Sequence, residues 1–152
     1  LDGGSMSHEF NVNLGKRLGE AIAAGAVFAA GTLLQTEVKK RLNLKSSLPP
    51  NPPSVAPEGP YRRFGTLGQS IQVDDRKNNG PKPLVRVGSA LPYAARLEFG
   101  FTGTDRKGRS INQGARPYMR DTLAKNVKNM QKAALRGAND VFKKFATSGG
   151  QA

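Results

Sequence analysis

The chain has 152 residues, a length that suits one domain with one modest hydrophobic core. It has no cysteine and a single histidine, His8, which excludes a disulfide framework, a thiolate metal site and a histidine cluster within one chain. The 24 Lys and Arg outnumber the 11 Asp and Glu, and the net charge of +13 indicates either a solvated basic face or contact with nucleic acid or an acidic protein surface.

We expect a single domain over residues 6–147. The five residues before Met6, LDGGS, resemble a cloning remnant, so residues 1–5 are expected to lie outside the domain. Three further segments are expected to be irregular, namely a proline-rich arm, a basic glycine-rich loop and a flexible tail, at residues 48–68, 100–115 and 148–152.

Residues 12–44 predict one long helix. Leu14, Leu18 and Ile22 recur every four residues and would share a face, and later in the segment so do Leu34, Val38 and Leu42. Asn13 is its expected N-cap. Its apolar run, residues 21–34, is shorter than the ~20 residues that span a bilayer and is mostly Ala and Gly. We therefore expect a buried helix that packs closely against another backbone, and no membrane contact.

Residues 45–68 hold six of the ten prolines. Proline lacks the amide donor and clashes with the preceding helical turn, so this segment cannot continue the helix. It predicts an extended, exposed connector. A PxxP ligand motif at Pro57 to Pro60 is the alternative interpretation.

Two strands are predicted at residues 69–74 and 84–88, where apolar and polar residues alternate. The polar segment between them contains an Asn-Gly pair, so the two strands form a β-hairpin with a long charged tip. A proline followed closely by two alanines, with a glycine behind, predicts a short helix over residues 92–99. Tyr93 and Leu97 would share the face that packs on the sheet.

A second long helix is predicted to begin at Pro117 and to end before two consecutive glycines. Its apolar residues recur at spacings of three and four, the strongest periodic pattern in the chain: Met119, Leu123, Val127, Met130, Ala134, Ala138, Val141 and Phe145. The opposite face carries four cations, Lys125, Lys128, Lys132 and Arg136. This face is either solvated or a contact for an anionic partner.

The segment from Gly103 to Ser110, GTDRKGRS, nearly spells a phosphate-binding loop, with Arg109 in place of the lysine. Such a loop needs a strand before it and a helix directly after it, so that the helix amides meet the phosphate. Here a short helix precedes the loop, and no helix begins until Pro117. We therefore predict a mobile basic arm, no cofactor and no metal. We also expect no enzyme activity, because no triad or carboxylate pair accompanies the lone acid Glu98.

Three phrases follow one another along the chain: GTLGQSI at residues 65–71, VRVGS at 85–89 with PYAARLEFG at 92–100, and ARPYM at 115–119. Together they resemble the tail-component family of long-tailed bacteriophages, also described as neck and tail-completion proteins. That family reads TG-x-L-x-x-SI, V-x-VG, YA-x-x-V-E-x-GT and ARPF in the same order. The resemblance covers residues 14–146, and the combination of YA-x-x-[VL]-EFG with ARP[FY][ML] is its most specific part.

The chain departs from this family at three places. The stretch at 100–114 is longer and more basic, the proline arm at 48–60 is extended, and Gly68 stands where the family has an arginine-like residue. These departures bear on partner contacts more than on the fold.

The resemblance implies a structural virion protein of the head–tail junction or tail end, without catalysis, that acts in tail completion and head–tail joining. It implies a homo-oligomeric ring, contacts with connector, tail-terminator or tail-tube proteins, and a stay in the host cytoplasm during assembly. Transient contact with genomic DNA is compatible with this role. The alternative function is a basic nucleic-acid-binding protein. We expect the basic residues to meet acidic faces of neighbouring rings.

The predicted fold class is α+β, with a small antiparallel sheet (the hairpin and a third strand) packed against two long helices, a short middle helix and extended loops. Glu98 is expected to cap backbone amides or to pair with Arg116. The motif residues expected to hold the fold are Ser70, Ile71, Tyr93, Ala94, Glu98, Phe99, Gly100, Ala115, Arg116, Pro117 and Tyr118. The candidate partner contacts are Arg62, Arg63, Arg106, Lys107, Arg109, Lys125, Lys128 and Lys132.

Overall fold

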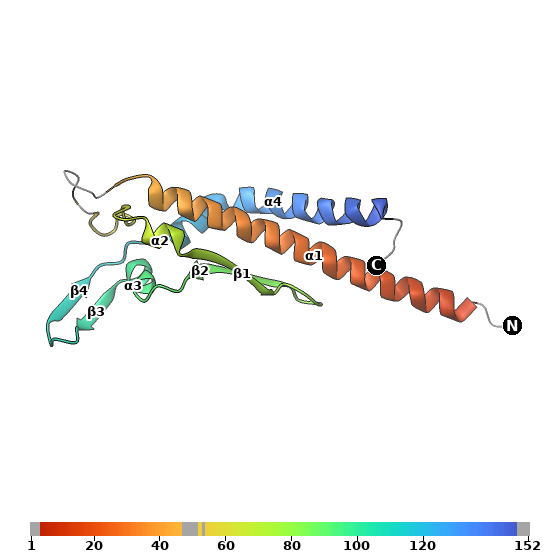
Figure 1. Ribbon diagram of the computed structural model, residues 1–152, viewed down its shortest axis with the longest axis horizontal. Coiled ribbons are helices and arrows are strands. Elements are labelled where there is room, and N and C mark those ends of the chain that lie inside the picture. The colour runs from red at the N-terminus through yellow and green to blue at the C-terminus, as the bar shows by residue number, and fades with distance from the viewer. Residues whose placement is uncertain (1–3, 47–51, 53, 149–152) are drawn as a thin grey trace. The chain divides into compact units, whose positions relative to one another are not determined.

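The computed structural model describes residues 4–46, 52 and 54–148 (Figure 1). Most of the predicted cloning remnant and tail, and part of the proline-rich arm, lie outside these residues. The elements are α1 (Gly4–Asn43), α2 (Thr66–Gln69), β1 (Ile71–Lys77), β2 (Leu84–Ser89), α3 (Ala94–Phe99), β3 (Phe101–Thr104), β4 (Ser110–Gln113) and α4 (Met119–Thr147). The described residues thus form two long helices and two antiparallel two-stranded sheets, which confirms the predicted α+β class.

The predicted third strand does not join the β1–β2 hairpin. Instead, β3 and β4 pair with each other in a separate sheet, with Phe101 opposite Gln113 and Thr104 opposite Ser110. These strands occupy the segment that was predicted to be a loop, so that prediction is wrong. Each strand has only four residues, and side chains alternate between partly buried and exposed along both. An alternation of only four residues is too short to identify a strand in the sequence, because a basic, glycine-containing turn lies directly beside it.

The described residues group into two compact units, each assembled from segments far apart in the sequence. The first unit comprises residues 4–32, 74–86 and 128–148. The second comprises the described residues of 33–73 and 87–127. Both long helices and the β1–β2 hairpin contribute residues to each unit. The prediction of a single domain stays a prediction.

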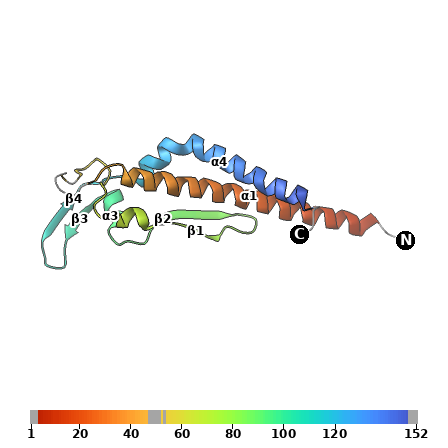
Figure 2. The ribbon, with the colours of Figure 1, turned by 45° about the horizontal axis from the view of Figure 1, so that its top comes forward.

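In the first unit, α1 and the second half of α4 run side by side (Figures 1 and 2). A Cβ atom added to Gly25 would lie 2.6 Å from a methyl carbon of Val141, and one added to Gly137 would lie 2.7 Å from Cβ of Ala29. The two backbones therefore approach so closely that each position leaves no room for a side chain. The Ala- and Gly-rich part of α1 packs against another backbone, as its composition predicted.

The start of α1 differs from the prediction, because the helix runs from Gly4 through Asn13. Asn13 is inside the helix and is not its N-cap. No proline or glycine stands between Ser5 and Asn13, so nothing there interrupts the helix. Within the described residues, the segment Asn13–Asn43 is long and apolar enough to cross a membrane by length and composition, a test that core helices of soluble proteins also pass.

The second unit contains a small hydrophobic core. Val38 and Leu42 of α1 are buried there with Ile71 of β1 and Tyr118, which precedes α4. Partly buried apolar side chains surround this cluster, namely Leu34, Leu67, Val87, Leu97 and Met119. The four-residue spacing of the α1 residues predicted their shared face. The Gln35 side chain also donates a hydrogen bond to the carbonyl of Ile71 at 2.9 Å, which joins the helix to the strand.

The proline-rich connector is mostly exposed where it is described, as predicted, but it is held by specific contacts. The amide of Arg62 donates to the carbonyl of Lys45 at 2.8 Å, next to an isolated bridge that pairs Arg62 with Ser46. The Lys45 ammonium and the Tyr61 hydroxyl both donate to the Glu58 carboxylate, at 2.7 and 2.6 Å. These bonds lower the pKa of Glu58 and raise the pKa of Lys45. The connector is therefore anchored beside the end of α1.

Candidate functional site

The centre of the second unit is an acidic side chain that binds the start of a helix. Glu98 lies in α3 and is only 4 % exposed. Its Oε2 accepts the backbone amides of Tyr118 and Met119 at 2.8 and 2.9 Å, and its Oε1 accepts the amide of Arg120 at 3.0 Å. The first amides of a helix have no partner within the helix, and negative charge is favourable beside them. Glu98 therefore caps α4, as the sequence suggested.

The ion-pair partner of Glu98 is Arg120, and the predicted pair with Arg116 is wrong. Nε of Arg120 donates to Oε1 of Glu98 at 3.2 Å. Burial raises the pKa of Glu98, but the amides of the α4 start and the Arg120 guanidinium outweigh it, so the pKa lies below its usual value. The guanidinium of Arg116 instead donates to the carbonyl and hydroxyl oxygens of Ser54, at 3.2 and 3.3 Å. Arg120 takes the predicted role because the first turn of α4 brings it to the carboxylate that caps the helix.

Backbone contacts tie the same two phrases together. The amide of Arg116 donates to the carbonyl of Leu97 at 2.7 Å. Gly100 has a φ of 79°, and a Cβ added there would lie 2.9 Å from the carbonyl oxygen of Gln113 and 3.0 Å from the amide nitrogen of Ala115. Only glycine fits this position without strain. We call the contacts between residues 97–100 and 113–120 the motif junction.

The other motif residues have varied surroundings. Ala94 and Ile71 are buried, and the Ser70 hydroxyl contacts the Ser89 hydroxyl at 2.7 Å. Phe99 is exposed, with the Arg120 guanidinium 5.5 Å from its ring centre. Pro117 is partly buried and directly precedes Tyr118. The motif is therefore mainly a structural framework.

Tyr118 links the motif junction to the core. Its side chain is buried, and burial together with the Glu98 charge and Tyr93 raises its pKa to about 12. Its backbone carbonyl accepts the hydroxyl of the buried Thr122 at 2.6 Å. The phenol therefore stays neutral at physiological pH, where it acts as a large packed ring.

A cavity of about 410 Å³ lies in the second unit. Its lining includes two motif residues, Tyr93 and Arg116, and two candidate partner contacts, Arg62 and Arg63. Tyr93 lines this cavity and is 43 % exposed. Tyr93 and Leu97 were predicted to pack together on the sheet, but only Leu97 packs against the core. Guanidinium groups bind carboxylates and phosphates well, so the cavity offers donors to an anionic group.

The turn between β3 and β4 is organised by Asp105. Its Oδ1 accepts the amides of Lys107 and Arg109 at 2.8 and 2.9 Å, and its Oδ2 accepts Nε of Arg109 at 2.7 Å. The amide and the side chain of Arg109, with the amide of Lys107, lower the pKa of Asp105. Arg106 and Lys107 are exposed. The segment that resembles a phosphate loop is thus a hairpin turn, with strand β4 rather than a helix after it.

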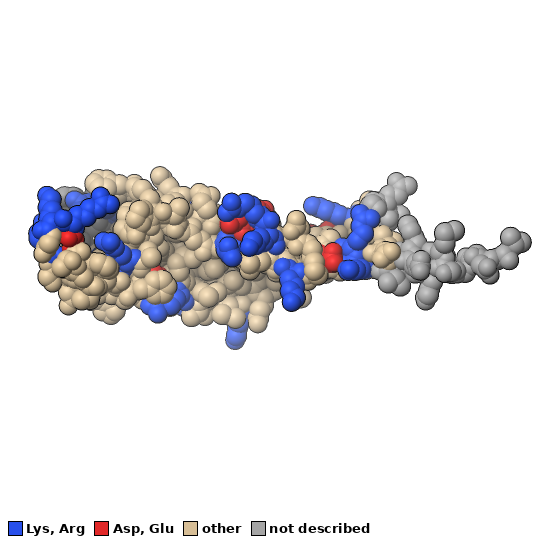
Figure 3. Space-filling model, turned by 90° about the horizontal axis from the view of Figure 1, so that it is seen from below, with Lys and Arg blue, Asp and Glu red and all other residues tan. Residues whose placement is uncertain are grey.

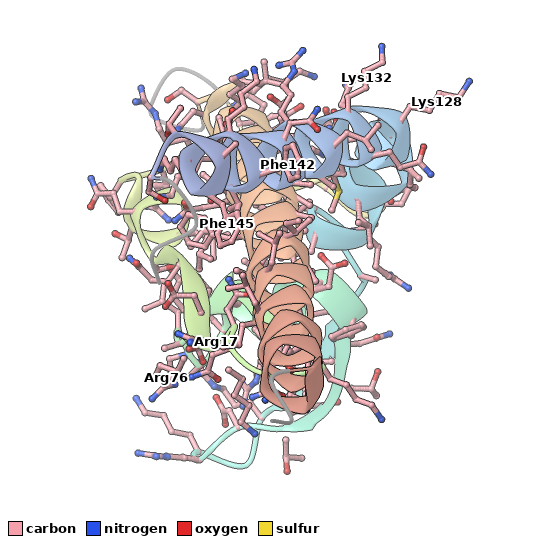
Figure 4. All side chains as sticks on the ribbon, turned by 90° about the vertical axis from the view of Figure 1, so that its right-hand side faces the viewer. Arg17, Arg76, Lys128, Lys132, Phe142 and Phe145 are labelled. Carbon is pink, nitrogen blue, oxygen red and sulfur yellow. The ribbon has the colours of Figure 1, made fainter. Side chains whose placement is uncertain are left out.

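The candidate contacts on α4 are exposed. Lys125 belongs to the second unit, and Lys128 and Lys132 belong to the first. Figure 4 shows the Lys128 and Lys132 side chains extending from the same side of α4, away from α1. On the face drawn in Figure 3, Lys and Arg form several groups with few acidic side chains among them.

The acids at the motif junction and at the β3–β4 turn, Glu98 and Asp105, both accept backbone amides. Within the described part of the chain, no group of three or more His, Cys, Asp or Glu could hold a metal ion. All four hydrogen bonds to the Glu98 carboxylate come from the start of α4 and from Arg120, which leaves it a structural cap.

Comparison with protein-family models, curated proteins and solved structures finds no match to this chain. The likeness to the phage tail-component family therefore rests on the three sequence phrases.

Proposed function

We propose that the chain is a structural protein of a long-tailed bacteriophage, which assembles as a ring at the head–tail junction or tail end in tail completion and head–tail joining. The proposal comes from the order and spacing of the family phrases. The motif junction supports it, because residues of two of these phrases, Glu98 and Tyr118, meet there in a structural contact. Contacts that fix the fold are expected in an assembly protein, because it acts through the shape of its surface.

The structural observation that best supports assembly is that several large apolar side chains are exposed to solvent. In the first unit, Leu135 and Phe142 of α4 are 67 % and 54 % exposed, and Phe28 of α1 is 43 % exposed. Leu135 and Phe142 are seven residues apart, about two turns, and so lie on the same side of α4. Exposed apolar side chains grouped on one side of an element are typical of surfaces that bind another protein.

The second unit has the same property. Leu123 and Val127, one turn apart in α4, were predicted to face a core, but they are 43 % and 46 % exposed. The apolar face that the periodicity of α4 predicts is therefore only partly buried by the chain itself. Burial of Leu123 and Val127 against another subunit would explain why the apolar face of α4 is longer than the core of one chain requires.

Mass measurement by light scattering, with electron microscopy of the same sample, tests this proposal. We expect a discrete, salt-resistant multiple of 16.2 kDa that forms closed rings. Replacement of one exposed apolar residue by a charge, Phe142→Glu, should lower the mass, because burial of a charge at an interface is unfavourable. A monomer at every concentration, or open fibres, would contradict ring assembly.

The matched control is Thr147→Glu, which adds the same charge at an exposed position of α4 that is five residues after Phe142 and about 140° around the helix from it. It should leave the oligomer mass unchanged. If both variants dissociate the oligomer equally, the added charge rather than the lost apolar contact is responsible, and the apolar surface no longer supports the proposal.

A further inference from the structure

The exposed side of α4 in the first unit carries a row of cations, with the exposed apolar residues Leu135 and Phe142 at its edge. Four exposed cations lie at spacings of four, four and seven residues, which places them on one side of the helix. We call them the basic stripe: Lys128, Lys132, Arg136 and Lys143. From the first to the last, the stripe is about 22 Å long at the helical rise of ~1.5 Å per residue.

The stripe is electrically uncompensated. Within the described residues, none of its four cations forms an ion pair with a carboxylate of the chain. One acid, Asp140, stands at its edge, four residues after Arg136. A net charge of +13 on the whole chain adds to the local field. The binding partner that this surface fits is therefore strongly anionic.

A second copy of this chain does not meet that requirement. Six acidic side chains of the described residues are already in ion pairs with cations of the same chain: Glu37, Glu58, Asp74, Glu98, Asp105 and Asp121. Two copies would therefore bring like charges together at the stripe. The apolar residues Leu135 and Phe142 suit self-association, and the stripe needs a different partner.

The composition of the stripe favours a nucleic-acid duplex over an acidic protein. Lysine is depleted at protein–protein interfaces, whereas interfaces with DNA are much more positively charged. Three of the four residues are lysines, which act as point charges toward phosphate and do not read bases in a fixed geometry. One exposed aromatic side chain, Phe142, lies beside Lys143, and a single ring does not form the series of stacking positions that binds the bases of a single strand.

We infer that the basic stripe of α4 binds the phosphate backbone of double-stranded nucleic acid without sequence preference. A length of about 22 Å matches the rise of roughly six base pairs at ~3.4 Å each, so all four cations can meet phosphates of one duplex. This inference does not depend on ring assembly, because the stripe lies in a single chain.

Fluorescence anisotropy with a labelled DNA duplex of about two helical turns tests this inference. The full chain and the variant K128Q/K132Q/R136Q/K143Q are titrated at several salt concentrations between about 50 and 200 mM. Removal of four phosphate contacts should make the slope of log K against log salt shallower by roughly three to four, and should weaken binding at least about tenfold at the lowest salt. Glutamine keeps a high helix propensity, so circular dichroism should be unchanged.

The matched control is K16Q/K77Q/K82Q/R86Q, which removes four exposed cations of the same unit from outside α4. It lowers the net charge by the same amount and should retain most of the slope. Equal losses in both variants would overturn the inference, because binding would then follow net charge alone. Failure of the full chain to bind at low salt would also overturn it. Displacement by polyglutamate as effective as displacement by unlabelled duplex, at equal charge, would assign the stripe to an acidic protein instead.

Discussion

The carboxylate of Glu98 accepts the backbone amide of Tyr118 at 2.8 Å, although the two residues are 20 positions apart. This bond joins the end of α3 to the start of α4, and it continues through the amides of Met119 and Arg120. The hairpin β3–β4 fills the sequence between them. The first amides of α4 are thus satisfied by an acid from another element.

Replacement of Glu98 by glutamine should destabilise the chain by about 1–3 kcal/mol, because the amide side chain keeps one acceptor, loses the charge and adds donors where only acceptors are needed. Urea denaturation followed by circular dichroism measures the change. Glu37→Gln, which removes a largely exposed pair with Lys40, is the matched control and should cost no more than about 0.5 kcal/mol. Equal effects of the two substitutions would show that Glu98 does not act as a cap.

The contribution of Glu98 should also depend on pH. Its pKa is lower in the folded chain than the reference value of 4.5, so the unfolded chain takes up the proton first as pH falls. The stabilisation is therefore complete above about pH 5 and is lost as pH falls through the folded-state pKa. The difference in unfolding free energy between the wild type and Glu98→Gln should therefore be constant from pH 7 to about pH 5, and it should shrink as pH falls from about 5 to about 3. A difference that stays constant over this range would contradict the assignment.

The sequence predicts those parts of the fold that depend on local patterns. The four-residue spacing of Val38 and Leu42 gives the buried face of α1, and the alternation around Ile71 gives β1. Glu98 was predicted to cap backbone amides or to pair with Arg116, and its bonds to the amides at the start of α4 confirm the cap.

Other features depend on tertiary contacts that no local pattern encodes. The strands β3 and β4 are only four residues long. Asp105 organises the turn between them, and the local sequence signal for this turn is an Asp three residues before Gly108. Arg120, rather than Arg116, pairs with Glu98 because the first turn of α4 places it there. Leu123 and Val127 keep helical periodicity yet remain exposed, since periodicity identifies a face but not what covers it.

The helix contact of the first unit should be sensitive to a single methyl group. A Cβ added to Gly137 would meet the carbonyl oxygen of Gly25 and Cβ of Ala29, and neither backbone nor Cβ can move independently. Gly137→Ala should therefore destabilise the chain by about 1–3 kcal/mol, despite the better helix propensity of alanine. The thermal unfolding midpoint measures this change.

Gly15→Ala and Gly19→Ala are the matched controls, because nothing lies within 4 Å of a Cβ at either position of α1. Each should raise the unfolding free energy, by up to about 1 kcal/mol, through helix propensity alone. A stabilising effect of Gly137→Ala similar to these two would show that the helices do not touch there.

The phenol of Tyr118 should titrate at high pH. Burial and the charge of Glu98 raise its pKa to about 12, above the reference value of 10.0. Because the unfolded chain releases this proton first, the stability that depends on the neutral phenol is complete below about pH 10 and is lost as pH rises toward 12. Ultraviolet titration of the phenolate absorbance should resolve a late step that disappears in Tyr118→Phe. If the late step persists in that variant, or if the folded wild type shows no late step, Tyr118 is not buried beside the Glu98 cap.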